Sequence, residues 1–227
     1  MKKLCAFIFF IAFNSYAGLV VNGTRFIYFE NFKALSIGVK NTSKETLLVK
    51  VNIENSHVTG TNINHGKPPF ITMPPLFVVS ANKESLLRVA YVPNSNKLPQ
   101  DKESLFNFTV LAIPSGKPVN NNIQLAIKQN FKLIYRPLKL GGDSENAYRL
   151  LVWRKSKTGL YIKNNTAYYV TLYNLTINGA VINNPGVIEP FGIRHEHWCQ
   201  ESLTCNISWS SLSDMGKIMP AVNANVK

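Results

Sequence analysis

Short runs in which apolar and polar residues alternate recur along the whole chain, and each run has the length of a β-strand. Turn-forming pairs such as Asn22-Gly23, Pro68-Pro69 and Asn178-Gly179 separate the runs. The clearest runs cover residues 25–29, 47–53, 86–91, 106–113, 150–153, 159–162, 168–173 and 205–209. No stretch keeps a helical period for long. The pattern therefore predicts an all-β protein made of antiparallel sandwiches, without helices crossing between parallel strands.

The length of the chain favours two domains of ordinary size over one sandwich. A break is expected at Pro137–Gly142, because proline cannot donate to a strand ladder and the Leu-Lys-Leu-Gly-Gly that follows is a short flexible joint. We predict a first domain over residues 18–137 and a second over 138–227. Two sandwiches joined in this way should leave a cleft between them.

The first seventeen residues have the pattern of a secretory signal peptide. Two lysines precede an apolar stretch over residues 4–13, and Ser15-Tyr16-Ala17 offers small residues at a cleavage site. Gly18 is then the first residue of the mature chain. The apolar stretch is too short to span a bilayer, and no lipoprotein-type boundary follows Cys5, so neither a membrane anchor nor a lipid is expected.

Composition argues against two classes of function. The net charge of +13 falls to +11 once Lys2 and Lys3 are removed, and the remaining lysines and arginines are scattered singly. Without a basic block interleaved with aromatic residues, no nucleic acid is expected as a partner, and the charge favours solubility or acidic partners. The chain also lacks the motifs of serine hydrolases, phosphate-binding loops and zincins, so we expect no enzyme.

The segment His195-Glu-His197-Trp-Cys199, followed by Cys205, has two interpretations. Two histidines and two cysteines could form a zinc site, although the spacing differs from that of the usual paired knuckles. In a secreted protein, two cysteines separated by five residues are more often joined in a disulfide. We therefore predict a Cys199–Cys205 disulfide, histidines on a strand surface, and no metal.

The middle of the chain carries an apolar row at strand spacing. Ile123, Leu125 and Ile127 share one face because side chains alternate along a strand, whereas Lys132 has the opposite parity. Arg136 follows, and Pro137 ends the segment at the expected domain edge. Periodicity alone favours an ordinary core strand; the whole arrangement also suits a strand that is lent to another protein.

Several segments resemble, in order, those of periplasmic pilus-assembly chaperones, the PapD-like family. Thr24-Arg25 with the apolar alternation after it is similar to the family's first strand, Ile71-Thr-Met-Pro-Pro75 to its Pro-Pro turn, and residues 97–113 to its signature segment. The cysteine pair of this chain is placed differently from the cysteine pairs of that family. Whether the Met73-Pro74 bond is cis or trans is left open. The chain departs from the family pattern at Asn52, Met73, Asn107 and Thr109.

The resemblance implies two immunoglobulin-like sandwiches in an L-shaped arrangement, working in the periplasm without a cofactor. Donor-strand complementation between chaperones and pilins is an established form of strand addition, and by resemblance the strand with Ile123, Leu125 and Ile127 is the one lent. Arg25 and Lys132 are then expected to bind the C-terminal carboxylate of the incoming pilus subunit.

Further expectations rest on the same resemblance. Glu103, Arg136 and Asp214 should form an ion network that fixes the angle between the domains. The partners implied are pilus (fimbrial) subunits and an outer-membrane usher, and a self-capping oligomer of the free chain is left open. The short polar connection over residues 114–122 is similar to the branch that serves rod-like adhesive pili. The alternative from another class is a secreted two-domain adhesin or other immunoglobulin-like binding module.

Overall fold

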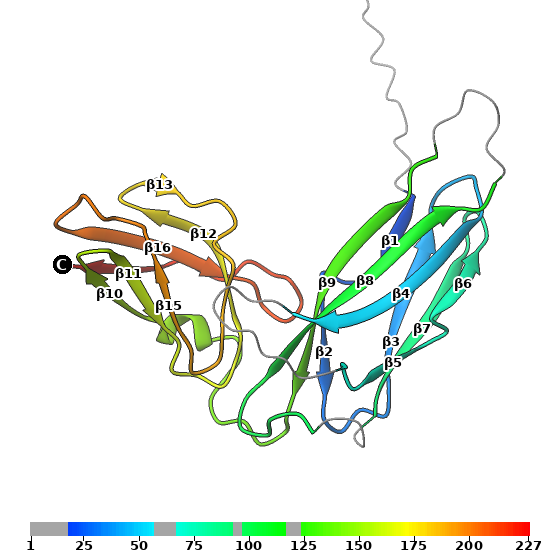
Figure 1. Cartoon of the computed structure of the whole chain (residues 1–227), viewed down its shortest axis with the longest axis horizontal. Helices are drawn as coiled ribbons and strands as arrows, with labels where there is room; N and C mark the ends of the chain where they lie inside the picture. Colours follow the sequence, from blue (N-terminus) through cyan, green and yellow to red (C-terminus); the bar gives the residue numbers. More distant parts are fainter. Residues whose placement is uncertain (1–17, 57–66, 93–96, 117–123) are drawn as a thin grey trace, which may run out of the picture.

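The computed structural model describes residues 18–56, 67–92, 97–116 and 124–227 (Figure 1). The expected signal peptide, residues 1–17, and Ile123 lie outside the described residues. Figure 1 shows two β-rich lobes set at an angle, joined near the bottom of the view, with the second lobe carrying the C-terminus.

The first lobe is a sandwich of two sheets with strand orders β1-β3-β7-β5 and β2-β9-β8-β4-β6. Its described strands are β1 (Leu19–Val21), β2 (Arg25–Phe29), β3 (Leu35–Asn41), β4 (Leu47–Asn55), β5 (Phe70–Met73), β6 (Leu76–Val79), β7 (Glu84–Tyr91), β8 (Ser104–Pro114) and β9 (Ile127–Arg136). The predicted strands over residues 25–29, 47–53, 86–91 and 106–113 all lie within these bounds. The Met73-Pro74 peptide bond is cis.

The chain passes from one sheet to the other between β1 and β2, and this crossing positions Arg25. Gly23 lies at the crossing with φ of 138°, a region that L side chains rarely adopt, and a Cβ there would meet the ring of Phe26 at 2.8 Å. After the crossing, β2 pairs in parallel with β9, so Arg25 is the register partner of Lys132.

The second lobe contains a sheet of order β10-β11-β15 and a sheet of order β13-β12-β16-β17, with β14 also paired to β12. Its described elements are a 3-10 helix η1 (Ala147–Leu150) and strands β10 (Val152–Ser156), β11 (Gly159–Lys163), β12 (Val170–Ile177), β13 (Ala180–Val181), β14 (Val187–Ile188), β15 (Ile193–Glu196), β16 (Cys205–Ser211) and β17 (Val222–Val226). In the described part of the chain, no helix is long and apolar enough to cross a membrane.

Two strand predictions were wrong at their starts: β12 begins at Val170, two residues after the predicted start at Tyr168, and β10 also begins late. Residues 150–153 were expected to be extended, but Leu150 ends η1 and β10 begins only at Val152. The late start of β10 is explained by contacts to residues distant in sequence: the Tyr148 carbonyl accepts a 3.0 Å hydrogen bond from Trp209 Nε1, and the Tyr148 hydroxyl donates to the Pro220 carbonyl. The backbone carbonyl and the hydroxyl of Tyr148 are thus satisfied by β16 and by the segment before β17, so this carbonyl needs no partner in a strand ladder.

Each lobe has its own hydrophobic core. The first includes Tyr28, Phe106 and Tyr135, whose rings lie in a cluster between the two sheets. The second is built around Trp153 and Trp209, with ring centroids 5.4 Å apart. Because neither core depends on the other, the polar contacts described next determine how the lobes are joined.

Candidate functional site

Arg25 and Lys132 lie side by side on β2 and β9 where the first lobe faces the second. Arg25 is buried and bridges the lobes: Nη1 donates to the Leu212 carbonyl at 3.0 Å and Nη2 to Thr171 Oγ1 at 2.6 Å. A guanidinium has five N–H donors, so three remain beyond these two contacts. The structure therefore brings the two predicted cations together and holds the arginine in place.

The electrostatics of this pair are those of a site that needs an anion. Burial lowers the pKa of Lys132 below its ordinary value, and the positive charge of Arg25 lowers it further. Burial also lowers the pKa of Arg25, although Asp214 and Glu103 act in the opposite direction. Within the described residues, no carboxylate lies within ion-pair distance of either cation. A bound carboxylate would relieve both effects.

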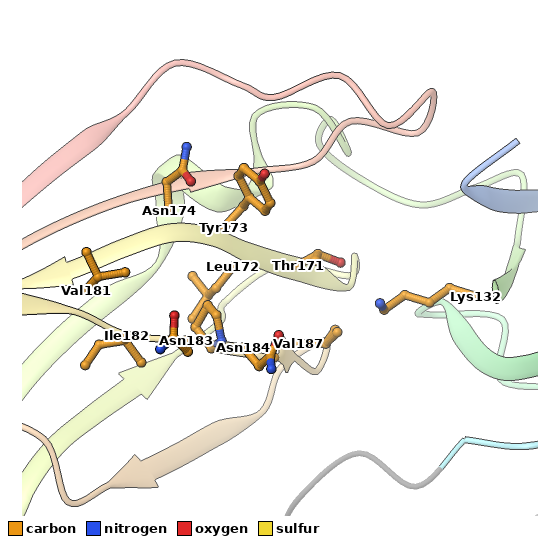
Figure 2. A pocket seen from close by; sticks show the side chains of 12 residues that line it. Lys132, Thr171, Leu172, Tyr173, Asn174, Val181, Ile182, Asn183, Asn184 and Val187 are labelled. Atoms are coloured by element: carbon orange, nitrogen blue, oxygen red, sulfur yellow. The ribbon is translucent and has the colours of Figure 1, made fainter. Parts of the chain in front are cut away.

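Lys132 also lines a pocket of about 370 Å³ that opens between the lobes (Figure 2). The opposite wall comes from β12 and from the segment that leads through β13 to β14, and Figure 2 shows the lysine side chain extending toward it. Thr171, Tyr173, Asn183 and Val187 are among its lining residues. The pocket thus joins a cation from the first lobe to a largely neutral wall from the second.

Leu125 and Ile127 precede Lys132 along the chain, and both side chains are exposed. Leu125 is 72% exposed and Ile127 is 44% exposed, and neither belongs to the core of the lobe. Ile127 pairs with Ala112 of β8, whereas β2 pairs with β9 only from Lys132 onward. The first half of β9 is therefore a sheet edge in the described part of the chain, and such an edge invites another strand.

Two departures from the family pattern fall on the inner neighbour of this edge. Asn107 of β8 is the register partner of Lys132, and Thr109 is the partner of Asn130. The Thr109 hydroxyl lies 3.0 Å from Asn130 Oδ1 and donates to it. Thr109 and Asn130 thus satisfy each other across the strands, and the register of β8 with β9 continues through both departures.

Glu103, Arg136 and Asp214 meet in one cluster where the lobes join. Arg136 Nε donates to Glu103 Oε1 at 2.6 Å, and its two terminal nitrogens donate to the two Asp214 oxygens at 2.6 and 2.8 Å. The bidentate geometry with Asp214 suits the planar guanidinium. Glu103 is 2% exposed and Arg136 is 9% exposed, so this network is largely removed from water.

Sequence reasoning missed several members of this cluster. Glu103 Oε2 accepts a 2.7 Å hydrogen bond from the Tyr169 backbone N–H, Ser144 donates to Asp214, and the Arg136 guanidinium lies over the rings of Phe29 and Tyr168. Burial raises the pKa of the Glu103 carboxyl, and Arg136 and the Tyr169 N–H oppose this shift. Hydrogen bonds and charges from Asp214 and Glu103 raise the pKa of Arg136 despite its burial, so it stays charged.

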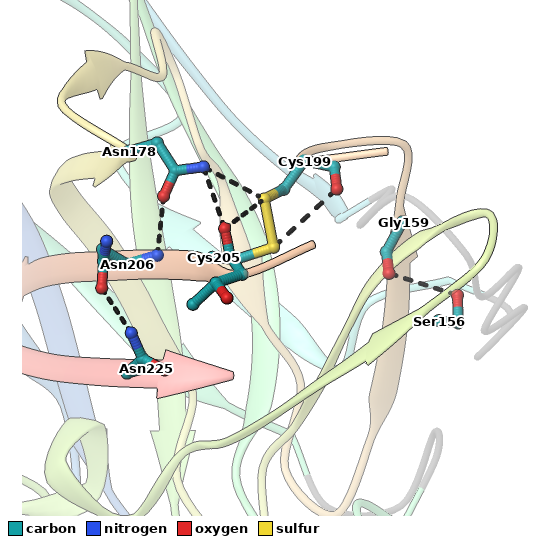
Figure 3. Close-up of a disulfide and its surroundings, with 8 residues drawn as sticks. Ser156, Gly159, Asn178, Cys199, Cys205, Asn206 and Asn225 are labelled. Carbon is teal, nitrogen blue, oxygen red and sulfur yellow. Dashed lines mark hydrogen bonds between the residues drawn. A yellow bond between two sulfur atoms is a disulfide. The ribbon is translucent and has the colours of Figure 1, made fainter. Parts of the chain in front are cut away.

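Cys199 and Cys205 form a disulfide at the start of β16 (Figure 3), as the cysteine spacing predicted. The Asn178 side chain lies beside it, donating to the Thr204 carbonyl at 3.2 Å and accepting from the Asn206 N–H at 2.8 Å. Because the disulfide uses both cysteines, the zinc alternative with cysteine ligands is excluded. Among the described residues, no group of three or more histidine, cysteine, aspartate or glutamate side chains could hold a metal.

Comparison with known proteins identifies the class. The model of the "Pili and flagellar-assembly chaperone, PapD N-terminal domain" matches residues 18–141, and that of the "Pili assembly chaperone PapD, C-terminal domain" matches residues 146–222. The chain belongs to this family of pilus-assembly chaperones, whose members are periplasmic and are not enzymes.

Individual relatives agree with this assignment. The chain is 33% identical to the fimbrial chaperone YcbF of Escherichia coli K12, covering 92% of this chain and 89% of the relative, and 34% identical to the chaperone FimC of the same strain, covering 92% and 85%. The crystal structure of the E. coli chaperone DraB superposes with a TM-score of 0.78 at 25% identity, covering 92% of this chain and 97% of that one. The Salmonella enterica SafB chaperone, solved in complex with the SafA pilin, gives a TM-score of 0.78 at 25% identity, covering 94% and 98%.

Proposed function

We propose that this chain binds pilus subunits in the periplasm by donor-strand complementation and delivers them to an outer-membrane usher. The observation that carries the proposal is an open strand edge with exposed Leu125 and Ile127, beside two cations that lack a carboxylate partner among the described residues. The solved complex of a related chaperone with a pilin supports it. Family membership favours this function over a secreted adhesin.

The lent segment carries Ile123, Leu125 and Ile127. A pilus subunit is a sandwich that lacks its last strand, so its core opens to water until another strand fills it. Alternate residues of the lent strand point into that opening. Burying each side chain contributes about 1.5–3 kcal/mol, or on the order of 5–9 kcal/mol for the row, before the costs of ordering both chains.

The carboxylate of the subunit's last residue is the group that Arg25 and Lys132 bind. A carboxylate only accepts hydrogen bonds, and these two side chains supply charged donors from neighbouring strands. Thr171 and Leu212 fix the arginine, so the lysine makes the larger adjustment on binding. Anchoring the end of the subunit chain also fixes its register against Leu125 and Ile127, where a one-residue slip would turn the wrong face inward.

Three further features complete the proposal. The chain enters the periplasm with a signal peptide cleaved after Ala17. The first domain ends at Pro137 and the second begins at Leu138, in the connection between β9 and η1. Glu103, Arg136 and Asp214 set the angle between the domains, so that Thr171 and Leu212 meet Arg25.

The test is recovery of a pilus subunit from periplasm with the chaperone carrying Leu125→Asp. The variant should fold normally and recover none of the subunit, because its carboxylate would be buried without a partner in the complex. Leu203→Asp is the matched control, since Leu203 is 92% exposed in the second lobe. Recovery with Leu125→Asp equal to that with Leu203→Asp would refute the proposal, and so would a Leu125→Asp protein that fails to fold.

A further inference from the structure

Two histidines of the second lobe remain outside the proposed subunit-binding function. His195 lies on β15, and His197 follows the end of that strand. Because successive side chains of a strand point to opposite faces, these two residues share one face. Their ring centroids are 5.0 Å apart with the planes at 85°, and Tyr161 of β11, the register partner of His195, packs on the other side with centroids 4.5 Å apart. Both rings are reached by solvent.

The turn between β10 and β11 orients both imidazoles. Thr158 in this turn lies next to both rings: its carbonyl is 3.1 Å from His197 Nδ1, and its hydroxyl is 3.2 Å from His195 Nε2. A carbonyl can only accept, so this contact favours the tautomer of His197 with the hydrogen on Nδ1 and a lone pair on Nε2. Gln200 Nε2 donates to the same carbonyl at 3.0 Å and lies 3.1 Å from His197 Nδ1, to which it can donate when that nitrogen carries no hydrogen.

The close approach of the β10–β11 turn to the end of β15 depends on the backbone conformation of Gly159. Gly159 has φ of 136°, and a Cβ at this position would collide with the Glu196 carbonyl oxygen. Only glycine therefore lets the turn approach the segment between the two histidines this closely. The position of Thr158 beside the two histidine rings is thus set by the backbone of the turn.

Metal-binding histidines share the contact seen at His197, in which one ring nitrogen lies against a backbone carbonyl. A ligating imidazole usually donates its other ring N–H to a carbonyl, carboxylate or water, and that contact sets the tautomer and ring orientation. Two nitrogens that bind one ion, each about 2.0–2.1 Å from it, lie about 3 Å apart. The two ring centroids here are 5.0 Å apart, so the rings are neighbours on the scale that such a site requires. The free nitrogens are His197 Nε2 and, with Nε2 of His195 donating to Thr158, His195 Nδ1.

We propose that His195 and His197 form an open two-histidine site for a divalent transition-metal ion. The disulfide removes Cys199 and Cys205 as ligands, and no third histidine, cysteine or carboxylate completes the set in the part of the chain described here. Water fills the remaining positions. Imidazole suits Cu²⁺, Ni²⁺ and Zn²⁺, and Cu²⁺ binds tightest to a given set of nitrogen ligands.

Calorimetric titration of the mature, untagged chaperone with CuCl₂, NiCl₂ and ZnCl₂ tests this site. A single Cu²⁺ should bind more tightly than Ni²⁺ or Zn²⁺, and His195→Ala and His197→Ala should each weaken it at least about tenfold, since even outer partners of a ligand change affinity by about 10–100-fold. Nitrogen splitting in the electron paramagnetic resonance spectrum of the Cu²⁺ complex should disappear in the double variant.

The control replaces the chain's two other histidines, His57→Ala with His65→Ala, and should leave Cu²⁺ affinity unchanged. Circular dichroism of each variant verifies that it is folded, which is expected because both rings of the pair are solvent-accessible. Cu²⁺ affinity that survives both single substitutions, or that is lost in the control, would overturn the site. Subunit recovery is a separate measurement, so the two proposals fail independently.

Discussion

The two halves of β9 have different surroundings. The half that begins at Ile127 pairs on one side only and leaves the Ile127 side chain exposed, whereas the half that ends at Arg136 lies between β2 and β8 with Leu133, Ile134 and Tyr135 buried. One continuous strand is thus a sheet edge at one end and the centre of a sheet at the other. Lys132 stands where the change occurs.

This contrast separates binding from stability along a single strand. A side chain that is exposed in the free protein contributes little to folding, and its apolar surface remains available to a partner. A side chain that is buried at the Arg136 end already packs inside the folded protein and contributes to its stability. Substitutions of the exposed Leu125 and Ile127 should therefore affect subunit binding alone, and those of buried residues at the other end should affect stability.

The largest effect is expected from Arg136→Ala at the buried end. It leaves Glu103 and Asp214 close together without their cation, and breaking a buried ion pair from one side costs about 3–5 kcal/mol. Urea unfolding measures the loss, with Lys128→Ala on the exposed half of the same strand as control. Solution scattering should also show an altered angle between the lobes. An Arg136→Ala protein as stable as the Lys128→Ala protein would show that the network does not hold the lobes together.

At the point of change, Lys132→Ala should abolish subunit recovery and preserve the fold. Each hydrogen bond to a charged group contributes about 1.5–3 kcal/mol, so losing one weakens binding by roughly 10- to 150-fold. Stability should not fall, because burial and Arg25 already disfavour the lysine charge in the free protein. Subunit recovery and thermal unfolding of the same preparations distinguish the two effects. Unfolding of the variant at a clearly lower temperature would instead assign Lys132 to the fold.

The disulfide should have a moderate effect that is confined to stability. Replacing Cys199 and Cys205 by serine opens a short loop, and loss of such a cross-link costs about 2 kcal/mol. Subunit recovery should be unchanged because the binding elements belong to β2 and β9. Chemical unfolding with and without reductant checks the first part. A variant that is as stable as the reduced wild type and recovers subunit supports the assignment; lost recovery in a folded variant contradicts it.

The smallest effect is a dependence of stability on pH at Lys132. Its pKa in the folded protein is lowered, so between that value and the ordinary 10.5 the unfolded chain holds a proton that the folded chain lacks. Stability contributed by this group therefore rises as pH increases toward 10.5 and is lost as pH falls through the folded pKa. The difference in unfolding free energy between wild type and Lys132→Met should grow in favour of wild type over that range. A constant difference would place Lys132 in ordinary solvent.

The sequence predicted the all-β class and most strands because alternation is local, and residues 106–113 show it clearly. It failed at residues 150–153, where Tyr148 bonds to Trp209 and Pro220, partners that no local pattern reveals. Periodicity also could not distinguish an exposed Leu125 from a core leucine, since both have the same spacing. The family resemblance supplied that distinction.

The residues of the candidate site also fall into those that the sequence predicted and those that it could not. Arg25, Lys132, Glu103, Arg136 and Asp214 could be named because they stand within or near recognisable segments. Thr171, 146 residues after Arg25, and the backbone N–H of Tyr169 could not, because a hydroxyl or an amide carries no sequence signal for a distant partner. These contacts depend on how the second lobe is placed against the first.

The most direct test of the account compares one peptide in two forms. A peptide with the last strand of a pilus subunit should bind the chaperone more weakly when its C-terminus is amidated, because the amide removes the charge that Arg25 and Lys132 receive. Amidation should hardly affect binding to the Lys132→Ala protein. Equal binding of the free-acid and amidated peptides to the wild-type chaperone would contradict the claim that this pair anchors the subunit and sets its register on β9.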